Sequence, residues 1–428
     1  MKAILDFIAA FMQQPALFLG LIALIGLLLL RERPEKVVSG VLKTAIGLLI
    51  LSAGSNLMSG AITPLGDLAA KLLKLPPVNV EIGTNKVIAE LGAAVGLVML
   101  FSFVVNVLIA RFTKLKYIYL TGHLIFWNAV VFTTTFKYVF HLGGFWLVLV
   151  SSIFTGLYQT IQPWYTHKFD LYVNDNNNFV LGHDSSLVVL STSLLSKWFS
   201  KDGKNKGRDM EELTFPKALS WMREPMLLMA VTFIILYVIV GCAQWGYLSE
   251  VATKAGYNPI IYMLVESLTF AAGFSILMAG VRMIIAELIP AFKGIAEKIV
   301  PGAMPALDCP LFFPYGQVSM AYGGLIGMLA MVLTSLIFSG FRYPYFIFAP
   351  TMSAWFHGAT GAVYGNKYWG IRGAILGGVI AGVLMGVGQA LMWPVLGYAI
   401  GDFFSWACDT DYVIFPWILS LIAKLFVR

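Results

Sequence analysis

The chain is a succession of long apolar runs separated by short polar stretches. Runs such as LIALIGLLLL (21–30) and AAVGLVML (93–100) are apolar on every side. A helix that crosses the hydrocarbon core needs about 20 mostly apolar residues, whereas a membrane barrel strand alternates apolar and polar positions. The pattern therefore predicts an all-α polytopic membrane protein and excludes a transmembrane barrel.

The apolar runs predict about eleven transmembrane helices. Clear candidates cover residues 8–30, 37–60, 88–110, 117–136, 143–162, 222–245, 257–281, 319–340 and 372–396, and shorter or interrupted ones lie near 343–363 and 412–427. The first run ends in Arg31-Glu32-Arg33 and shows no small-residue cleavage site before the next run. We therefore interpret it as a retained helix and not as a signal peptide.

Composition supports the membrane assignment. Of 428 residues, 59% are hydrophobic and 12% charged, and the mean hydropathy is +0.80. Soluble proteins carry about 25% charged residues, so a soluble enzyme, a disordered chain and a nucleic-acid-binding domain are excluded. The three cysteines (Cys242, Cys309 and Cys408) have no paired spacing, so neither a disulfide framework nor a metal knuckle is expected. We expect no metal and no cofactor.

The basic clusters predict an orientation. They follow odd-numbered spans: Arg31, Arg33 and Lys36 after the first, Arg111, Lys114 and Lys116 after the third, and several lysines in the long loop 197–217 after the fifth. The positive-inside rule then places the N-terminus outside and this loop in the cytoplasm. An acidic loop with Asp402, Asp409 and Asp411 is expected outside, and the C-terminus in the cytoplasm.

Two segments do not fit simple spans. Residues 163–199 are too polar to face lipid and too apolar for a free loop. Residues 282–300 predict an amphipathic helix in the interface, and residues 301–318 are broken by prolines and Gly302. Irregular backbone at membrane depth is tolerated where it lines a cavity. We therefore expect re-entrant pieces around a central site, as in secondary carriers.

An internal repeat is a further hypothesis. Segments 40–50 and 370–380 share glycine at their first and eighth positions and have similar hydropathy. Composition alone could also produce this match, because small residues are common where membrane helices pack closely. A repeat divides the chain into a first half (1–220) and a second half (221–428), each contributing to a core domain and a dimerising domain.

A few polar residues interrupt the apolar sequence. A central Asp or Lys costs about 2.5–3.5 kcal/mol, so such groups face cavities or partners. The candidates are Ser55, Asn56, Thr84, Asn85, Glu90, His123, His183, Asp184, Glu266 and Asp308. Taken singly, each could simply bond a neighbouring helix. The Gly-His pair at 122–123 and 182–183, with Asp308 in a proline-broken turn, favours one shared pocket for a polyhydroxylated solute.

Other interpretations of these residues stay open. His141, His167 and His357 are expected to be bystanders in loops. Paired histidines could hold haem in a membrane oxidoreductase, although only His123 lies clearly in a span. A carrier coupled to protons or sodium could use Glu90, Glu266 or Asp308 as a relay.

Three motifs resemble one known family. The run GVRMIIAELIPAFKGIAEKIVPGAMPALDC (280–309), with YLTGHLIF (119–126) and FVLGHDSS (179–186), resembles the ascorbate-type membrane component (enzyme IIC) of the bacterial phosphotransferase system. Weaker similarity extends to 49–60 and 358–374, so the resemblance covers most of the chain.

The resemblance implies a homodimeric inner-membrane carrier of two inverted halves. A mobile core would carry the solute past a static dimerising domain in an elevator-like movement. A partner IIB protein would phosphorylate the solute from a phosphocysteine, and we expect IIB and IIA to be separate proteins. The chain itself would therefore be a transport component and not an enzyme. The implied solute contacts are Ser55, Thr84, His123, His183 and Asp308.

Two positions depart from the ascorbate-type pattern. Trp127 and Asp184 stand where that family carries glutamines, and such a change alters the donor and acceptor pattern that sets specificity. Asp184 would repel an ascorbate anion, whereas it could accept a hydrogen bond from a hydroxyl of a neutral sugar. The ring of Trp127 could pack against a sugar ring. We add both to the predicted site, and expect ascorbate or a related sugar or sugar alcohol as the solute.

Overall fold

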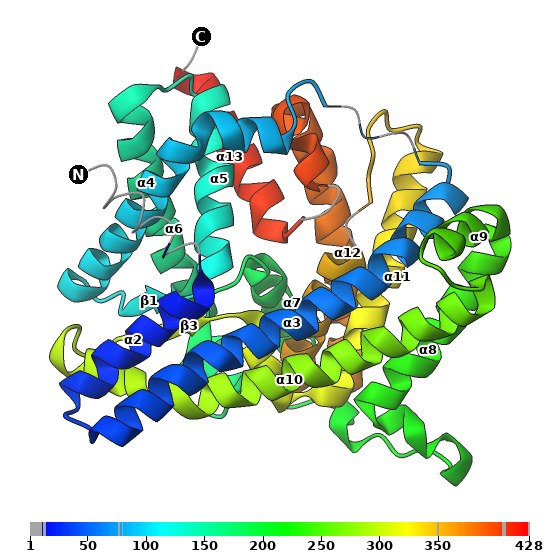
Figure 1. The fold of residues 1–428 in the computed structure, drawn as a ribbon, viewed down its shortest axis with the longest axis horizontal. Coiled ribbons are helices and arrows are strands. Elements are labelled where there is room, and N and C mark those ends of the chain that lie inside the picture. The colour runs from blue at the N-terminus through cyan, green and yellow to red at the C-terminus, as the bar shows by residue number, and fades with distance from the viewer. Residues whose placement is uncertain are drawn as a thin grey trace.

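The computed structural model describes residues 11, 14–75, 78, 80–348, 351–404 and 408–426. Helices dominate, which confirms the all-α class (Figure 1). The helices are α2 (Pro15–Leu29), α3 (Pro34–Leu72), α4 (Thr84–Phe112), α5 (Gly122–Tyr138), α6 (Gly144–Val173), α7 (Ser186–Phe199), α8 (Pro225–Ala243), α9 (Trp245–Lys254), α10 (Pro259–Lys298), α11 (Gln317–Gly340), α12 (Thr351–Phe404) and α13 (Thr410–Phe426). Short 3-10 helices are η1 (Met210–Glu212), η2 (Lys217–Arg223) and η3 (Cys309–Tyr315).

Seven of the helices in the described residues are long and apolar enough to cross a membrane: α3, α4, α6, α8, α10, α11 and α12. The apolar helices α2 and α7 are shorter. The chain is therefore a multi-pass membrane protein. The first predicted run, 8–30, is seen as a helix from Pro15, and most of 8–13 lies outside the described residues.

Helix α12 is a hairpin of two antiparallel limbs. Gly361 packs against Gly377, and Gly365 against Gly373, across a turn at Trp369 and Gly370. Gly370 has φ +58°, a conformation that favours glycine. The interrupted run 343–363 and the span 372–396 thus contribute to the two limbs of this hairpin.

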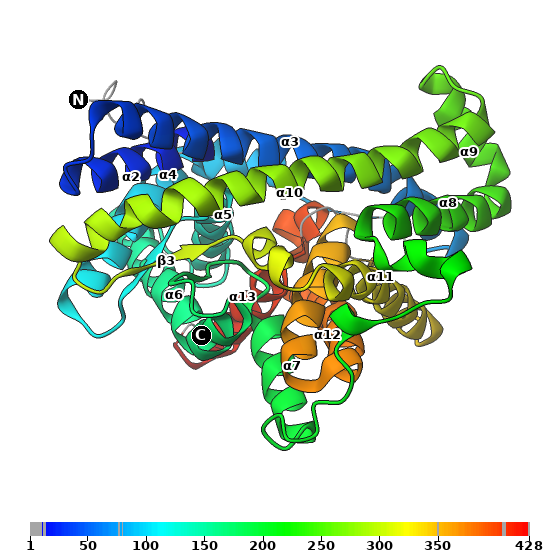
Figure 2. The same cartoon turned by 90° about the horizontal axis from the view of Figure 1, so that it is seen from below.

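Two long antiparallel helices, α3 and α10, form one layer with α2, α8 and α9, as Figure 2 shows. The helices approach closely at glycines. A Cβ on Gly54 would lie 2.3 Å from the backbone nitrogen of Leu277, and one on Gly280 would lie 2.4 Å from that of Leu51. Small residues allow this close packing where the hydrophobic effect does not drive helices together.

The remaining helices, α4 to α7 and α11 to α13, form a second group. In it α4 packs on α6, α11 on α12, and α12 on α7 and α13. Both groups contain helices from residues 1–220 and from 221–428. The repeat itself stays a prediction. Its two segments have different surroundings, because 40–50 lies within α3 and 370–380 lies in the second limb of α12.

The predicted interfacial helix 282–300 is wrong as a separate element. Helix α10 continues without interruption to Lys298. Ile284, Leu288 and Ala291 on this part of α10 are buried, and Gly294 touches Gly26 of α2. The apolar face that suggested an interfacial helix packs instead against α2 and α3.

Three short strands form a parallel sheet that the sequence pattern did not predict. They are β1 (Tyr117–Tyr119), β2 (Val180–Leu181) and β3 (Met304–Leu307), in the order β1-β3-β2. Residues 117–136 are therefore not one helix, because α5 begins only at Gly122. The irregular part of 163–199 is shorter than expected, because α6 extends to Val173. Residues 301–316 contain no α-helix, as the prolines of this segment predicted.

The predicted acidic outer loop is also wrong. Asp409 and Asp411 lie inside the protein, and Asp402 binds the start of α4. Helix α13 runs from the interior toward the top of Figure 1, whereas the chain that leads into α8 lies at the bottom. Which side faces the cytoplasm stays a prediction.

Candidate functional site

The carboxyl ends of the three strands meet at one edge of the small sheet. Parallel strands end on the same side, so the residues after them are neighbours. His123 lies at the start of α5, four residues after the end of β1. His183 lies two residues after β2, and Asp308 follows β3 directly. The hydroxyl of Thr121 donates to the carbonyl of Gly182 at 2.6 Å and joins the two outer strand ends. The two Gly-His motifs and Asp308 therefore belong to one site.

The glycine before His183 permits this approach. A Cβ on Gly182 would lie 2.8 Å from the carbonyl carbon of Ala306. The amide of Gly182 donates to the carbonyl of Leu307 at 2.7 Å. A larger residue would push the chain that carries His183 away from β3.

Buried side chains satisfy the outer edges of the sheet. Asn106 of α4 accepts from the amide of Tyr119 at 3.0 Å and donates to the carbonyl of Tyr117 at 3.1 Å. Asp170 of α6 accepts from the amide of Leu181 at 3.0 Å. Unpaired backbone groups at membrane depth are costly, so these two side chains make the short sheet possible there.

A cavity of about 350 Å³ opens in front of the strand ends, within the usual range for small-molecule sites. Residues of α3 form one wall, and residues of the second helix group form the other. The polar and aromatic lining includes Ser52, Ser55, Asn56, His123, Trp127, His183, Ser353, Phe356, Asp308 and Asp409. The cavity thus lies where the two groups of helices meet.

Asp308 lies between the two histidines. Its carboxylate oxygens are 3.8 Å from Nε2 of His123 and 3.7 Å from Nε2 of His183. These separations exceed a direct hydrogen bond, so all three groups can bind a further polar group placed between them. The amide of Cys309 donates to Asp308 at 2.7 Å and orients the carboxylate.

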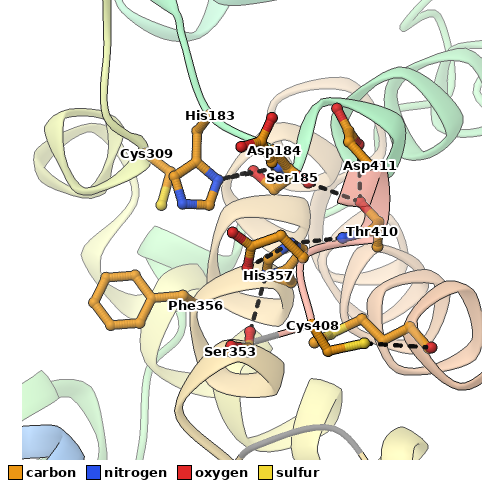
Figure 3. Close-up of polar contacts among 12 residues, drawn as sticks. His183, Asp184, Ser185, Cys309, Ser353, Phe356, His357, Cys408, Thr410 and Asp411 are labelled. Carbon is orange, nitrogen blue, oxygen red and sulfur yellow. Dashed lines mark hydrogen bonds and ion pairs between the residues drawn. The ribbon is translucent and has the colours of Figure 1, made fainter. Parts of the chain in front are cut away.

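The bonds of His183 indicate where its proton lies. Its Nδ1 accepts from the backbone amide of Ser185 at 3.1 Å, as Figure 3 shows. In a neutral imidazole the other nitrogen then carries the hydrogen. Nε2 of His183 is thus a donor directed toward Asp308 and the cavity.

His357 lies in the interior and not in a loop, so the interpretation as a loop residue is wrong. Its Nδ1 donates to the carbonyl of Ser353 at 2.9 Å, and its Nε2 accepts from the amide of Thr410 at 3.3 Å. Nε2 lies 3.6 Å from Asp409. His357 therefore holds the segment at Thr410, as Figure 3 shows. The preceding residue, Asp409, lines the cavity.

The structure brings together most of the predicted contacts. Ser55, His123, Trp127, His183 and Asp308 all line the cavity. Asp409 joins them, although the sequence pattern placed it in an outer loop.

Two predicted contacts lie elsewhere. Thr84 is buried at the start of α4, where its amide and hydroxyl donate to Asp402 at 2.9 and 2.7 Å. Asp184 is fully buried behind the cavity and bonds Tyr158 and Gln162. Neither lines the cavity, so the structure does not bring these two residues together with the other predicted contacts. Asp184 lies in the turn between β2 and α7, directly after His183.

A polar stripe on α6 also escaped the sequence reasoning. Ser151, Thr155, Gln159, Gln162 and Thr166 are all fully buried. Their spacing of three to four residues puts them on one face of the helix, and that periodicity is the signal that could have revealed a polar interior. The run 143–162 is thus apolar only on its other faces.

One group of side chains has the geometry to hold a metal ion. The ligand atoms of His183, Asp308 and Cys309 lie within 4.8 Å of one another. The Cys309 thiol is buried, and two of the three residues already belong to the polar cavity.

Comparison with known proteins shows a family that covers most of the chain. Residues 10–411 match the family described as the sugar-specific permease component of the phosphotransferase system (EIIC-GAT). A relative from Mycoplasma pneumoniae, an ascorbate-specific EIIC component of that system, is 28% identical over 419 residues. The alignment covers 86% of this chain but 63% of the relative, so the chain spans less than two thirds of that protein's length. The family match extends over both helix groups and the cavity between them, and the chain belongs to the family of sugar-specific permease components of the phosphotransferase system.

Proposed function

We propose that this chain is an enzyme IIC permease that moves ascorbate or a related sugar or sugar alcohol inward across the bacterial inner membrane. A partner IIB protein, charged by IIA, phosphorylates the solute as it is delivered. The observation that carries this proposal is the placement of Asp308 between His123 and His183 at the cavity. The name of the Mycoplasma relative supports an ascorbate-like solute.

The chemistry of the cavity suits hydroxyl groups. A sugar hydroxyl donates one hydrogen bond and accepts others. Asp308 supplies an acceptor, and Nε2 of His183 supplies a donor. Ser55 and Asn56 add groups that do both, and Trp127 offers an apolar ring. Trp127 and Asp184 are the two positions that differ from the ascorbate-type pattern. Because Asp184 lies behind the cavity, only Trp127 of these two would face the solute.

The position of the cavity supports an elevator-like movement. One wall belongs to α3 and the other to α5, η3, α12 and the strand ends. If the second helix group slides along the α3–α10 layer, the histidines and Asp308 move together while the α3 wall changes. We assign the static, dimerising part to α2, α3, α8, α9 and α10, and the mobile core to α4 to α7 and α11 to α13.

Uptake measurements test this function. Membrane vesicles containing the full chain, with and without IIA, IIB and the phosphoryl donor, should accumulate phosphorylated solute only when the complete relay is present. Asp308→Ala should abolish this accumulation, and Asp202→Asn, at an exposed position in the loop 197–217, should leave it intact. Accumulation of unmodified solute driven by an ion gradient would instead identify a proton- or sodium-coupled carrier. A haem-containing oxidoreductase has no support from the family match.

A further inference from the structure

An apolar groove of about 780 Å³ runs between α4 and α6. It shares no lining residue with the solute cavity. Its lining on α4 extends from Glu90 to Val105, and its lining on α6 extends from Gly144 to Ile153. At 1.5 Å per residue, the stripe on α4 is about 22 Å long. The groove therefore has the shape of a hydrocarbon chain and not that of a compact solute.

The two helices run in the same direction along the groove. Asn106 of α4 donates to the hydroxyl of Thr160 of α6 at 2.8 Å. A Cβ on Gly156 would lie 2.7 Å from the carbonyl oxygen of Ser102. These two contacts are four residues apart on each helix and follow in the same order on both. The first turns of α4 and α6 are therefore at the same end of the groove.

This end of the groove lies at the level of the lipid headgroups. Residues 91–110 of α4 and 144–163 of α6 contain no charged side chain, and a stretch of about 20 mostly apolar residues crosses the hydrocarbon core. Glu90 directly precedes the first stretch. Trp146, at the start of the second, is 62% exposed, and tryptophan is enriched at the membrane–water interface. The groove thus has a polar end among headgroups and an apolar body in the hydrocarbon.

Two opposite charges lie at the polar end. Glu90 and Lys137, which is in the last turn of α5, both line the groove. Within the described residues they form no ion pair with each other, and the Lys137 ammonium has no partner there. Oε2 of Glu90 accepts from the hydroxyl of Tyr138 at 3.3 Å, and Oε1 has no donor among the same residues. The two side chains can therefore bind a ligand that carries both a negative and a positive group.

We propose that the groove binds one phospholipid whose headgroup contains a phosphate and a primary amine, as in phosphatidylethanolamine. The phosphate binds the ammonium of Lys137, and the headgroup ammonium donates to the carboxylate of Glu90. One acyl chain lies along the apolar stripes of α4 and α6. Charged partners shorten and strengthen such hydrogen bonds, so the headgroup fixes the lipid at this place.

The charge pattern distinguishes this lipid from other phospholipids. A headgroup with a phosphate but no amine places a negative charge near Glu90 and nothing to balance it. A quaternary amine keeps the positive charge but has no N–H to donate to the carboxylate. Because the groove and the solute cavity share no residue, the lipid site does not depend on which solute the protein carries.

Native mass spectrometry of the purified full chain tests the proposal. The protein is delipidated in detergent and then incubated with phosphatidylethanolamine, phosphatidylcholine or phosphatidylglycerol that have identical acyl chains. We expect one tightly bound phosphatidylethanolamine per chain, with an affinity roughly tenfold above that for the other two lipids, because each of them loses a hydrogen bond to a charged group. Equal affinities for the three lipids would overturn the proposal.

Charge variants test the two headgroup contacts. Lys137→Gln and Glu90→Gln should each weaken the binding of phosphatidylethanolamine roughly tenfold. Glu90→Gln should also improve the relative binding of phosphatidylglycerol, because it removes the like charge. Lys168→Gln, at an exposed position of α6 outside the groove, is the matched control and should bind as the wild type does. Wild-type affinity in both Lys137→Gln and Glu90→Gln would refute the headgroup site.

A variant that fills the groove tests the place of the acyl chain. Ala93 lines the groove and is exposed, so Ala93→Phe adds bulk there without disturbing the interior. We expect it to lose the bound phosphatidylethanolamine while the lipid-free protein keeps the melting temperature of the wild type. Retained lipid binding in Ala93→Phe would overturn the proposal. A dimer of the lipid-free wild type that Ala93→Phe dissociates would also overturn it, because a second copy would then occupy the groove.

Discussion

The carboxylate of Asp308 lies 3.7 Å from Nε2 of His183, and the two residues follow neighbouring strands of a parallel sheet. The distance leaves the donor of His183 and the acceptor of Asp308 available to the cavity. A solute hydroxyl bound there would bridge residues from both halves of the chain. We therefore expect solute affinity to depend on the register of this short sheet.

Removing either partner should weaken solute binding without unfolding the protein. Hydrogen bonds to charged groups contribute about 1.5–3 kcal/mol, or roughly ten- to a hundredfold in affinity. We expect His183→Ala and Asp308→Ala to show losses of this size in equilibrium binding by the purified protein. Asp202→Asn, far from the cavity in an exposed loop, is the control. Wild-type affinity in both alanine variants would refute the assigned site.

Thr84 should affect stability and not affinity. Its amide and hydroxyl bind Asp402, which lies at the amino end of α4, where a negative charge is favourable. Thr84→Ala loses the hydroxyl bond, and we expect a loss of about 1 kcal/mol in stability. A thermal unfolding series with and without solute would measure both effects. Thr63→Ala loses only a local bond to Ser59 and is the control. A large affinity loss in Thr84→Ala would show direct contact with the solute.

Trp127 should influence which solute is preferred. It lines the cavity one helical turn after His123, where its ring can cover an apolar face of a sugar. Trp127→Gln replaces that face with an amide, the group found at this position in the ascorbate-type pattern. We expect its thermal-shift profile over ascorbate, pentoses, hexoses and alditols to move toward ascorbate. Trp127→Phe, which keeps an aromatic face, should retain the wild-type order, and an unchanged order in Trp127→Gln would contradict the prediction.

Gly54 should be essential to the α3–α10 layer. A Cβ there would lie 2.3 Å from the Leu277 nitrogen and 2.6 Å from the Gly273 carbonyl oxygen. Overpacking of this kind costs about 1–3 kcal/mol. We expect Gly54→Ala to lower the melting temperature clearly, whereas Gly60→Ala in the same helix has nothing within 4 Å of the new Cβ and should be neutral. Equal melting temperatures for the two variants would show that the helices pack less closely.

Much of the architecture could be predicted from the sequence. Runs that are apolar on all sides identify membrane spans, because side chains that face the hydrocarbon core must be apolar and a helix pairs its own backbone polar groups. Of the predicted spans, 37–60, 88–110 and 319–340 lie within α3, α4 and α11. The Gly-His motifs and Asp308 also stood out, since polar groups are costly at membrane depth.

The errors arise where local pattern is ambiguous. A short apolar run can be a strand or a helix, and residues 117–121 were therefore read as helix although β1 pairs with β3 there. The polar spacing of 282–300 suited an interfacial helix because the pattern does not reveal that α2 and α3 cover its apolar side. Only the packed neighbours distinguish these cases.

The direction of each polar side chain was decided by the tertiary structure. The residue types alone showed that His183 and Asp184 were unusual at membrane depth, and both were assigned to the solute. In the fold, His183 faces the cavity, whereas Asp184 in the same turn contacts Tyr158 behind it. Asp409 lies at the cavity because the segment before α13 packs against α12. His357 of α12 holds that segment through Thr410. The hydrophobic pattern determines which segments enter the membrane, but contacts between distant segments determine which polar groups meet.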